Sequence, residues 1–137
     1  IHLNTVFFIY MIGFVPGHPF MGDLDAKLFL NRLKTPRVKI PAGSIGIVEK
    51  FCNIYPYESP GGWNIIGKTP KKIFNSRDST NPCLLSPGDT VKFKSISKEE
   101  FKKPENLSIT VDCDDYKNSQ EGDPLDDDNA VDEELQM

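Results

Sequence analysis

The sequence predicts an all-β fold, a sandwich or a barrel, and three observations support this prediction. Short apolar runs recur along the chain and are separated by Pro and Gly. In "TVKFKSI", Val91, Phe93 and Ile96 nearly alternate with Lys92 and Lys94, which is the period of a strand with one solvent-facing side. Helical patterns are few.

The first expected strand is the run "VFFIYMIGFV", residues 6–15, which ends at "PG". A membrane helix needs about 20 apolar residues, and a signal peptide needs a basic start and a small-residue cleavage site. The β-branched and aromatic content therefore favours a buried strand. Further strands are expected in "RVKIPAGSIGIVEKF" (two pieces), in "WNIIGKTP", in "KKIFN" and after the turn of "LLSPGDTVKFKSI".

Two segments predict short helices. Residues 23–33, "DLDAKLFLNRL", have room for two or three turns, with Asp23 as the N-cap and Leu24 and Leu28 facing inward. Residues 97–103, "SKEEFKK", open like a capping box, with Ser97 three residues before Glu100. We interpret Asp23 and Asp25 as cap and turn residues and not as a catalytic pair.

The charge divides the chain into two regions. Residues 1–103 carry 15 Lys+Arg and 8 Asp+Glu, a balance of +7, whereas residues 104–137 carry 1 Lys and 12 Asp+Glu, a balance of −11. We expect one β domain over 1–103. The acidic tail has too few apolar residues to offset its chain entropy, so we expect disorder over 104–137, with a short strand at "LSITV" as the alternative.

Cysteine usage favours a reducing compartment, and we expect a cytoplasmic protein. Cys52, Cys83 and Cys113 are odd in number and lie far apart, without a CxxC pair. A thiol nucleophile served by His2 or His18 is not favoured, because no motif surrounds any of the three. No P-loop and no HExxH is present, so spacing indicates neither a nucleotide site nor a metal site.

The stretch "SPGGW" places the only tryptophan after two glycines. Gly61 and Gly62 allow positive φ angles, or they let another part of the chain approach closely. Trp63 then plugs the end of a barrel, or it forms the wall of a pocket whose floor is glycine. The residues alone leave both interpretations open.

Four blocks in a fixed order carry a family resemblance: "GFVPGHPFMGDLD", "TPRVKIPAGSIGI", "IYPYESPGGWNIIGKTP" and "LLSPGDTVKF". The set resembles the family of KipI, allophanate hydrolase subunit 1 and the B component of 5-oxoprolinase, with a related unit in urea amidolyase. The resemblance covers residues 6 to 96. It implies a cyclophilin-like closed β-barrel, and it implies an α/β domain ahead of the barrel, so Ile1 is expected to be a truncation point.

The resemblance also implies a function. A subunit of an ATP-dependent amide or lactam hydrolase is expected, acting on 5-oxoproline or on allophanate, with ATP as cosubstrate and a related barrel subunit (KipA or the C component of 5-oxoprolinase) as partner. The alternative is a binding module of the KipI kind, which inhibits a sensor histidine kinase. Its contact loop would contain Pro16, Gly17, His18 and Pro19. Neither nucleic acid nor a membrane is expected as a partner.

Candidate substrate-binding residues come from the same blocks. The Arg37 fork suits a carboxylate or phosphate, although a surface ion pair is the simpler interpretation. The "PAGS" turn offers backbone N–H groups. Lys68 stands where the family often has Arg. The full candidate set is Arg37, Gly43, Ser44, Tyr55, Ser59, Gly61, Gly62, Trp63 and Thr69.

The chain departs from the family pattern before the "IYP" block and after the first "PG". The family usually has a glutamine, a small residue and a glycine where this chain has Phe51, Cys52 and Asn53, and it has an aromatic residue where this chain has His18. Phe51 cannot replace hydrogen bonds that a glutamine makes to a ligand. We expect these changes to affect activity more than fold.

Overall fold

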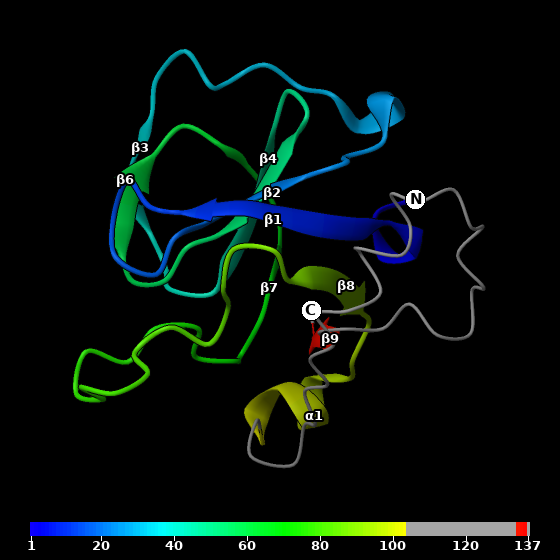
Figure 1. Cartoon of the computed structure of the whole chain (residues 1–137). Coiled ribbons are helices and arrows are strands. Elements are labelled where there is room, and N and C mark those ends of the chain that lie inside the picture. The colour runs from blue at the N-terminus through cyan, green and yellow to red at the C-terminus, as the bar shows by residue number, and fades with distance from the viewer. Residues whose placement is uncertain (104–133, 137) are drawn as a thin grey trace.

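The protein is built mainly from β-strands (Figure 1). The structure is a computed structural model that describes residues 1–103 and 134–136. The described strands are β1 (Val6–Ile12), β2 (Pro19–Gly22), β3 (Arg37–Ile40), β4 (Ser44–Val48), β5 (Phe51–Ile54), β6 (Ser59–Gly61), β7 (Asn64–Lys68), β8 (Thr90–Lys94) and β9 (Glu134–Gln136). The helices are two 3-10 turns (His2–Asn4 and Ala26–Leu28) and α1 (Lys98–Lys102).

Seven strands form one sheet in the order β7-β4-β5-β2-β1-β8-β9, and β3 pairs with β6 in a separate ribbon. Neighbours in the sheet are antiparallel, except that β9 runs parallel to β8. The sheet curls, and the ribbon lies at one end of it (Figure 1). The mainly β prediction is confirmed. Closure of the barrel is shown only in part, because no hydrogen-bonded pairing of the described strands joins β7 to the opposite edge.

Two groups of buried side chains form the core. The larger group lies against the curled sheet and includes Phe7, Ile9, Met21, Ile45, Ile54, Val91 and Phe93. The smaller group consists of Ile40, Val48, Tyr55 and Trp63, and Phe20, Phe51 and Ile65 pack against it. Trp63 is only 7% exposed, so its indole fills the space between the ribbon and the sheet, as the plug interpretation expects.

The predicted helix over residues 23–33 is wrong. Only a 3-10 turn forms, and Asp25 caps it by accepting a hydrogen bond from the N–H of Lys27 at 2.8 Å. Asp23 is not the cap and has a φ of 72°. The physical reason is that backbone groups toward the end of this segment bind distant parts of the chain: the N–H of Glu49, in the β4–β5 turn, donates to the Leu30 carbonyl at 2.7 Å, and the Leu33 N–H donates to the Gly62 carbonyl at 2.8 Å.

Other expected elements fare differently. The capped helix at 97–103 is confirmed as α1, with both hydrogen bonds of the capping box between Ser97 and Glu100. The strand in "KKIFN" is wrong, since the described contact is a single bridge between Phe74 and Cys83. The prediction for 104–137 lies outside the described residues, apart from the three residues of β9.

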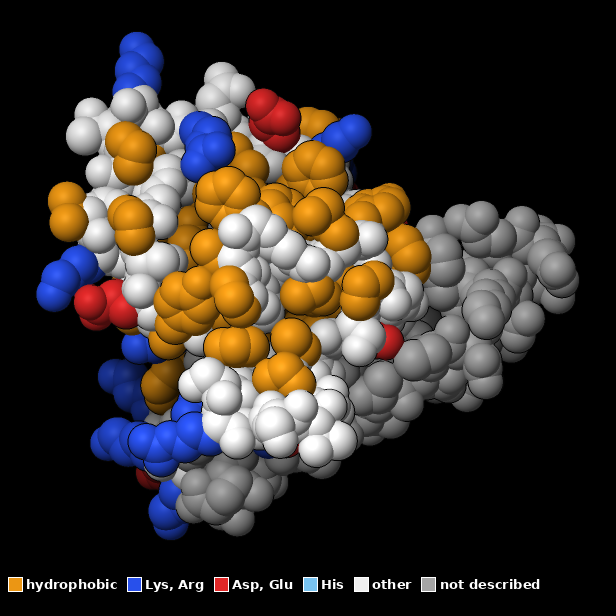
Figure 2. Space-filling view, turned by 60° about the vertical axis from the view of Figure 1, so that its left-hand side comes forward, with side chains coloured by type: hydrophobic (Ala, Val, Ile, Leu, Met, Phe, Trp, Pro, Cys, Tyr) orange, Lys and Arg blue, Asp and Glu red, His pale blue; other side chains and the backbone are white. Residues whose placement is uncertain are grey.

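Apolar side chains gather on the face at the ribbon end of the molecule, which Figure 2 turns toward the viewer. Phe14, in the β1–β2 turn, is 90% exposed, and Val38 of β3 is 83% exposed. Phe14 has a φ of 70°, a backbone conformation that L-residues rarely adopt.

The two glycines before Trp63 have different surroundings. Neither has a positive φ. A Cβ at Gly61 would collide with the hydroxyl of Tyr55 and would lie 3.1 Å from Ile40 Cδ1, whereas a Cβ at Gly62 would have its nearest neighbour, Arg32 Nε, at an ordinary 3.5 Å. Close approach is therefore the reason for the first glycine, and a tyrosine side chain makes the approach.

We expect Gly61→Ala to lower the free energy of unfolding by about 1–3 kcal/mol, because the added methyl group overpacks the smaller core. Gly62→Ala is the matched control and should leave this free energy unchanged or raise it by less than about 1 kcal/mol. Denaturant unfolding of the two variants makes the comparison. Equal losses at both positions would contradict the packing argument.

Candidate functional site

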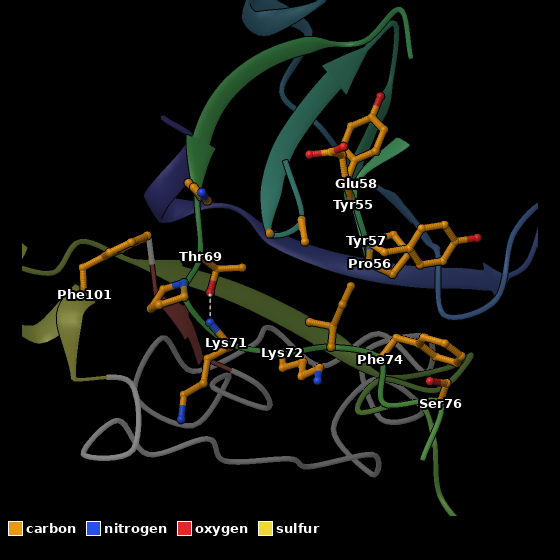
Figure 3. A pocket seen from close by; sticks show the side chains of 15 residues that line it. Tyr55, Pro56, Tyr57, Glu58, Thr69, Lys71, Lys72, Phe74, Ser76 and Phe101 are labelled. Atoms are coloured by element: carbon orange, nitrogen blue, oxygen red, sulfur yellow. Dashed lines mark hydrogen bonds between the residues drawn. The ribbon is translucent and has the colours of Figure 1, made fainter. Parts of the chain in front are cut away.

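A pocket of about 700 Å³ opens where two of the family blocks, residues 35–47 and 54–70, meet (Figure 3). Its lining comes from the segments 42–43, 55–58 and 68–76 and from α1. The lining residues are Ala42, Gly43, Tyr55, Pro56, Tyr57, Glu58, Lys68, Thr69, Pro70, Lys71, Lys72, Ile73, Phe74, Ser76 and Phe101. The volume falls in the range of small-molecule sites.

Gly43 joins the three segments through its backbone. Its N–H donates to the carbonyl of Tyr55 at 2.8 Å, and its carbonyl accepts the N–H of Thr69 at 2.8 Å. Its φ is +82°, and a Cβ would collide with the Thr69 carbonyl oxygen. Only glycine satisfies both conditions without strain, so the sequence "PAGS" fixes the floor of the pocket.

The charges of the lining are mostly positive. Lys68, Lys71 and Lys72 lie on either side of the buried Thr69, whose hydroxyl accepts the N–H of Lys71 at 3.2 Å. The carboxylate in the lining is that of Glu58, which forms an ion pair with Lys39 at 3.6 Å. Because both side chains of that pair are well exposed, the pair adds little stability, and the pocket keeps an excess of positive charge.

A second group of predicted site residues lies along the β3–β6 ribbon. Arg37 is paired with Gly61, and Ile40 is paired with Ser59, so "TPRVKIPAGS" and "SPGGW" lie side by side. The guanidinium of Arg37 donates to the carbonyl of Trp63 at 3.0 Å. This bond uses one arm of the fork, and the rest of the exposed side chain faces solvent.

His18 and Asn53 form a buried polar pair beside this ribbon. The side-chain nitrogen of Asn53 donates to Nε2 of His18 at 2.7 Å. His18 is 5% exposed and packs edge-on against Phe20, with ring centroids 4.7 Å apart. Burial lowers the pKa of His18 to about 4, although a backbone hydrogen bond at Gly13 acts in the opposite direction. The imidazole is therefore neutral near pH 7, and its Nε2 can accept the hydrogen bond from the Asn53 amide.

Tyr55 contributes both to the large pocket and to the group of residues at the β3–β6 ribbon. Its backbone carbonyl binds Gly43 at the pocket, while its ring is buried in the smaller core. Burial raises the pKa of the Tyr55 phenol, and the nearby Asn53 side chain and the Arg37 guanidinium act in the opposite direction. The phenol stays protonated and serves as a hydrogen-bonding group.

The structure thus divides the predicted site in two. It brings Gly43, Tyr55 and Thr69 together at the pocket, along with Lys68. It groups Arg37, Gly61 and Trp63 at the ribbon. The remaining predicted residues, Ser59, Gly62 and the buried Ser44, do not line the large pocket.

Most residues of the predicted contact loop, 16–19, are buried. Gly17, His18 and Pro19 are buried, and Pro16 is the exposed member of the four. Contact of this loop with a partner stays a prediction, and Pro16 is the one of the four residues whose side chain is exposed to a partner.

Sequence reasoning missed several lining residues. The lysine run in "GKTPKK" was a usable signal for Lys71 and Lys72, and the aromatic residues of "IYPYES" and "KKIFN" were a weaker one for Tyr57 and Phe74. Phe101 carried no signal, because it reaches the pocket from α1, about 30 residues along the chain.

Among the other reactive groups, Cys52 Sγ lies 4.0 Å from Nε2 of His2. Cys52 is fully buried, and burial raises the pKa of its thiol well above the ordinary range, so it is a poor nucleophile. Cys83 is half-buried, and Cys113 lies outside the described residues. Within 1–103 and 134–136, no three His, Cys, Asp or Glu side chains gather as metal ligands, and no helix is long and apolar enough to cross a membrane.

The sequence of this chain is similar to known proteins. The family model for the carboxyltransferase domain, subdomain C and D, matches residues 1–85. The chain belongs to this family. The B component of the 5-oxoprolinase of Bacillus subtilis is 44% identical over 101 residues, which is 74% of this chain and 42% of that protein. The urea amidolyase of Saccharomyces cerevisiae is 33% identical over 102 residues, which is 72% of this chain and 5% of that protein.

A solved structure has a similar fold and sequence. A conserved uncharacterized protein from Pyrococcus horikoshii matches with a TM-score of 0.69 and 44% identity, over 74% of this chain and 46% of that one. The resemblance to the family of the 5-oxoprolinase B component is confirmed. The chain spans about two fifths of the length of the 5-oxoprolinase relatives it matches.

The depressed pKa of His18 predicts a pH dependence for this family member. The folded state holds His18 neutral down to about pH 4, while the unfolded chain takes up the proton near the ordinary pKa of 6.5. The stabilisation is complete above pH 6.5 and is lost as the pH falls toward 4, by up to about 1.4 kcal/mol per pH unit. Denaturant unfolding between pH 7 and pH 5 should show this slope, and His18→Phe should reduce it. An unchanged slope in the variant would contradict the assignment.

Because the buried side chains of His18 and Asn53 bind each other, we expect their effects on stability to be coupled. His18→Phe leaves the buried Asn53 amide without its partner, and Asn53→Gly does the same to the imidazole, so each costs about 1–3 kcal/mol. The double variant removes both partners and should lose about 0.5–3 kcal/mol less than the sum of the single variants. Denaturant unfolding of the four proteins measures this coupling, and strictly additive losses would refute it.

Proposed function

We propose that this chain is part of a subunit of an ATP-dependent hydrolase of amide bonds, with 5-oxoproline as the leading substrate. The observation that carries the proposal is the 44% identity to a 5-oxoprolinase B component over 74% of the chain. Relatives named urea amidolyase make allophanate the second substrate to test. A KipI-type kinase inhibitor is the less favoured alternative, because the relatives carry hydrolase names.

The described residues can supply substrate-binding groups for such a site. Arg37 is exposed at the ribbon, and its free N–H groups suit the carboxylate of a small lactam. Tyr55 supplies a protonated phenol close to that arginine. ATP, when it is used, supplies the phosphoryl group that makes the amide oxygen a leaving group. The Cys52–His2 contact in this chain holds a fully buried thiol whose pKa is raised by that burial, so we infer that a partner subunit completes the chemistry.

The partner is then a related barrel subunit, of the KipA type or the type of the 5-oxoprolinase C component. The relatives are named as one lettered part of 5-oxoprolinase, which supports an assembly of several chains. We propose the cytoplasm as its place, in agreement with three cysteines that form no pair in the sequence.

The proposal is tested by co-expressing the chain with candidate partner subunits. We expect ATP hydrolysis that depends on 5-oxoproline in the complex and is absent when either the chain or the partner is omitted. Stimulation of ATP hydrolysis by allophanate, and not by 5-oxoproline, would make allophanate the substrate and would keep the assignment to the hydrolases of amide bonds. ATP hydrolysis that ignores both amides would refute it.

In the same complex, Arg37→Lys should raise the KM for 5-oxoproline, because a point charge replaces a two-armed fork. Stability should hardly change, since Arg37 is exposed. Lys39→Arg, two residues away on the same strand, is the control and should leave this KM unchanged.

A further inference from the structure

A second pocket, of about 620 Å³, lies over strands β1, β2 and β5. Side chains alternate between the two faces of a strand. Met21 and Cys52 point into the larger core, and their strand neighbours Gly22 and Phe51 line the pocket. The strand residues of this lining therefore belong to the face of the sheet opposite the larger core, and none of them lines the large pocket.

Most of the lining of this second pocket is apolar. Tyr10 lies over Gly22, because a Cβ at that glycine would collide with the tyrosine ring. Phe20 and Phe51 are half-buried and pack against the smaller core, while the side chain of Met11 is 48% exposed. Since packing holds the two phenylalanine rings in place, the pocket offers a preformed aromatic surface to an apolar group.

The lining also contains one carboxylate and one ammonium group. Asp23 directly follows β2, and Lys50 directly precedes β5, so continuing the antiparallel register of the two strands places these residues opposite each other. Both are exposed, and within the described residues no ion pair joins them. Instead, Nζ of Lys50 lies 5.4 Å from the centroid of the Phe51 ring, and Asp23 accepts a long hydrogen bond of 3.5 Å from the Tyr10 hydroxyl.

A ligand that carries both charges and a flat apolar group fits this arrangement. An α-amino acid holds an ammonium group and a carboxylate on one carbon, and these suit Asp23 and Lys50. An apolar acid leaves the aspartate unmatched, and an apolar amine leaves the lysine unmatched. 5-Oxoproline does not fit either, because its nitrogen is an uncharged amide and its ring is small and polar.

We propose that the second pocket binds a free aromatic α-amino acid. Lys50 pairs with the carboxylate, Asp23 pairs with the ammonium group, and the aromatic side chain lies against Met11, Phe20 and Phe51. This site is separate from the large pocket and from Arg37. It goes beyond the proposed hydrolase function and does not depend on it.

The test is calorimetric titration of the full chain with three ligands: L-phenylalanine, N-acetyl-L-phenylalanine, which lacks the ammonium group, and phenethylamine, which lacks the carboxylate. Lys50→Gln should weaken the two carboxylates by about three- to tenfold and should not weaken phenethylamine, since one charge-assisted contact is lost. Asp23→Asn should weaken L-phenylalanine and phenethylamine to the same degree and should not weaken the acetylated ligand. Asparagine tolerates the φ of 72° at this position.

Matched variants control for charge and for apolar surface. Lys34→Gln and Glu99→Gln remove the same charges outside the pocket and should change each Kd by less than about twofold. Met11→Ser should weaken all three ligands several-fold, whereas Val38→Ser, at another exposed apolar side chain, should weaken none. Thermal unfolding confirms that each variant is folded.

Three results would overturn the proposal. The first is the absence of L-phenylalanine binding at millimolar concentration. The second is binding of glycine as tight as that of L-phenylalanine, because glycine carries both charges and no ring. The third is an equal loss of affinity for all three ligands in Lys50→Gln, which would show that the lysine does not recognise the carboxylate.

Discussion

The backbone of Gly43 holds together the part of the molecule on which the candidate site depends. It accepts from Thr69 and donates to Tyr55, so one residue connects the start of β4 to segments 12 and 26 positions further along the chain. Its positive φ and its contact with the Thr69 carbonyl exclude every side chain. Without this junction, the lysines after β7 and the aromatic residues after β5 would not face one pocket.

Tyr55 extends this constraint to the ribbon. Its carbonyl is fixed at Gly43, and its hydroxyl lies where a Cβ at Gly61 would be. Gly61 in turn pairs with Arg37, which binds the Trp63 carbonyl. Gly61 therefore serves packing, and its pairing with Arg37 sets the position of that arginine relative to Tyr55. Two sites that differ in chemistry share one rigid frame.

The local pattern was sufficient for most strands, because alternation and turn residues are properties of the segment itself. It failed at 23–33 and in "KKIFN", where the structure is decided by distant partners: the Leu30 carbonyl binds Glu49, and the Leu33 N–H binds Gly62. The candidate site shows the same limit. Block residues such as Gly43 and Thr69 were predictable, whereas Phe101 reaches the pocket only through the tertiary fold.

Three residues that depart from the expected family pattern, Phe51, Asn53 and His18, lie outside the large pocket, whereas a fourth, Lys68, lines it. Asn53 and His18, 35 positions apart, bind each other, which gives each buried side chain one hydrogen bond. Phe51 packs against the smaller core beside Phe20 and does not line the pocket. At the pocket, Lys68 keeps the charge of the expected arginine and loses its two-armed fork. The three residues outside the pocket are thus accommodated by packing, while the pocket lining keeps its excess of positive charge.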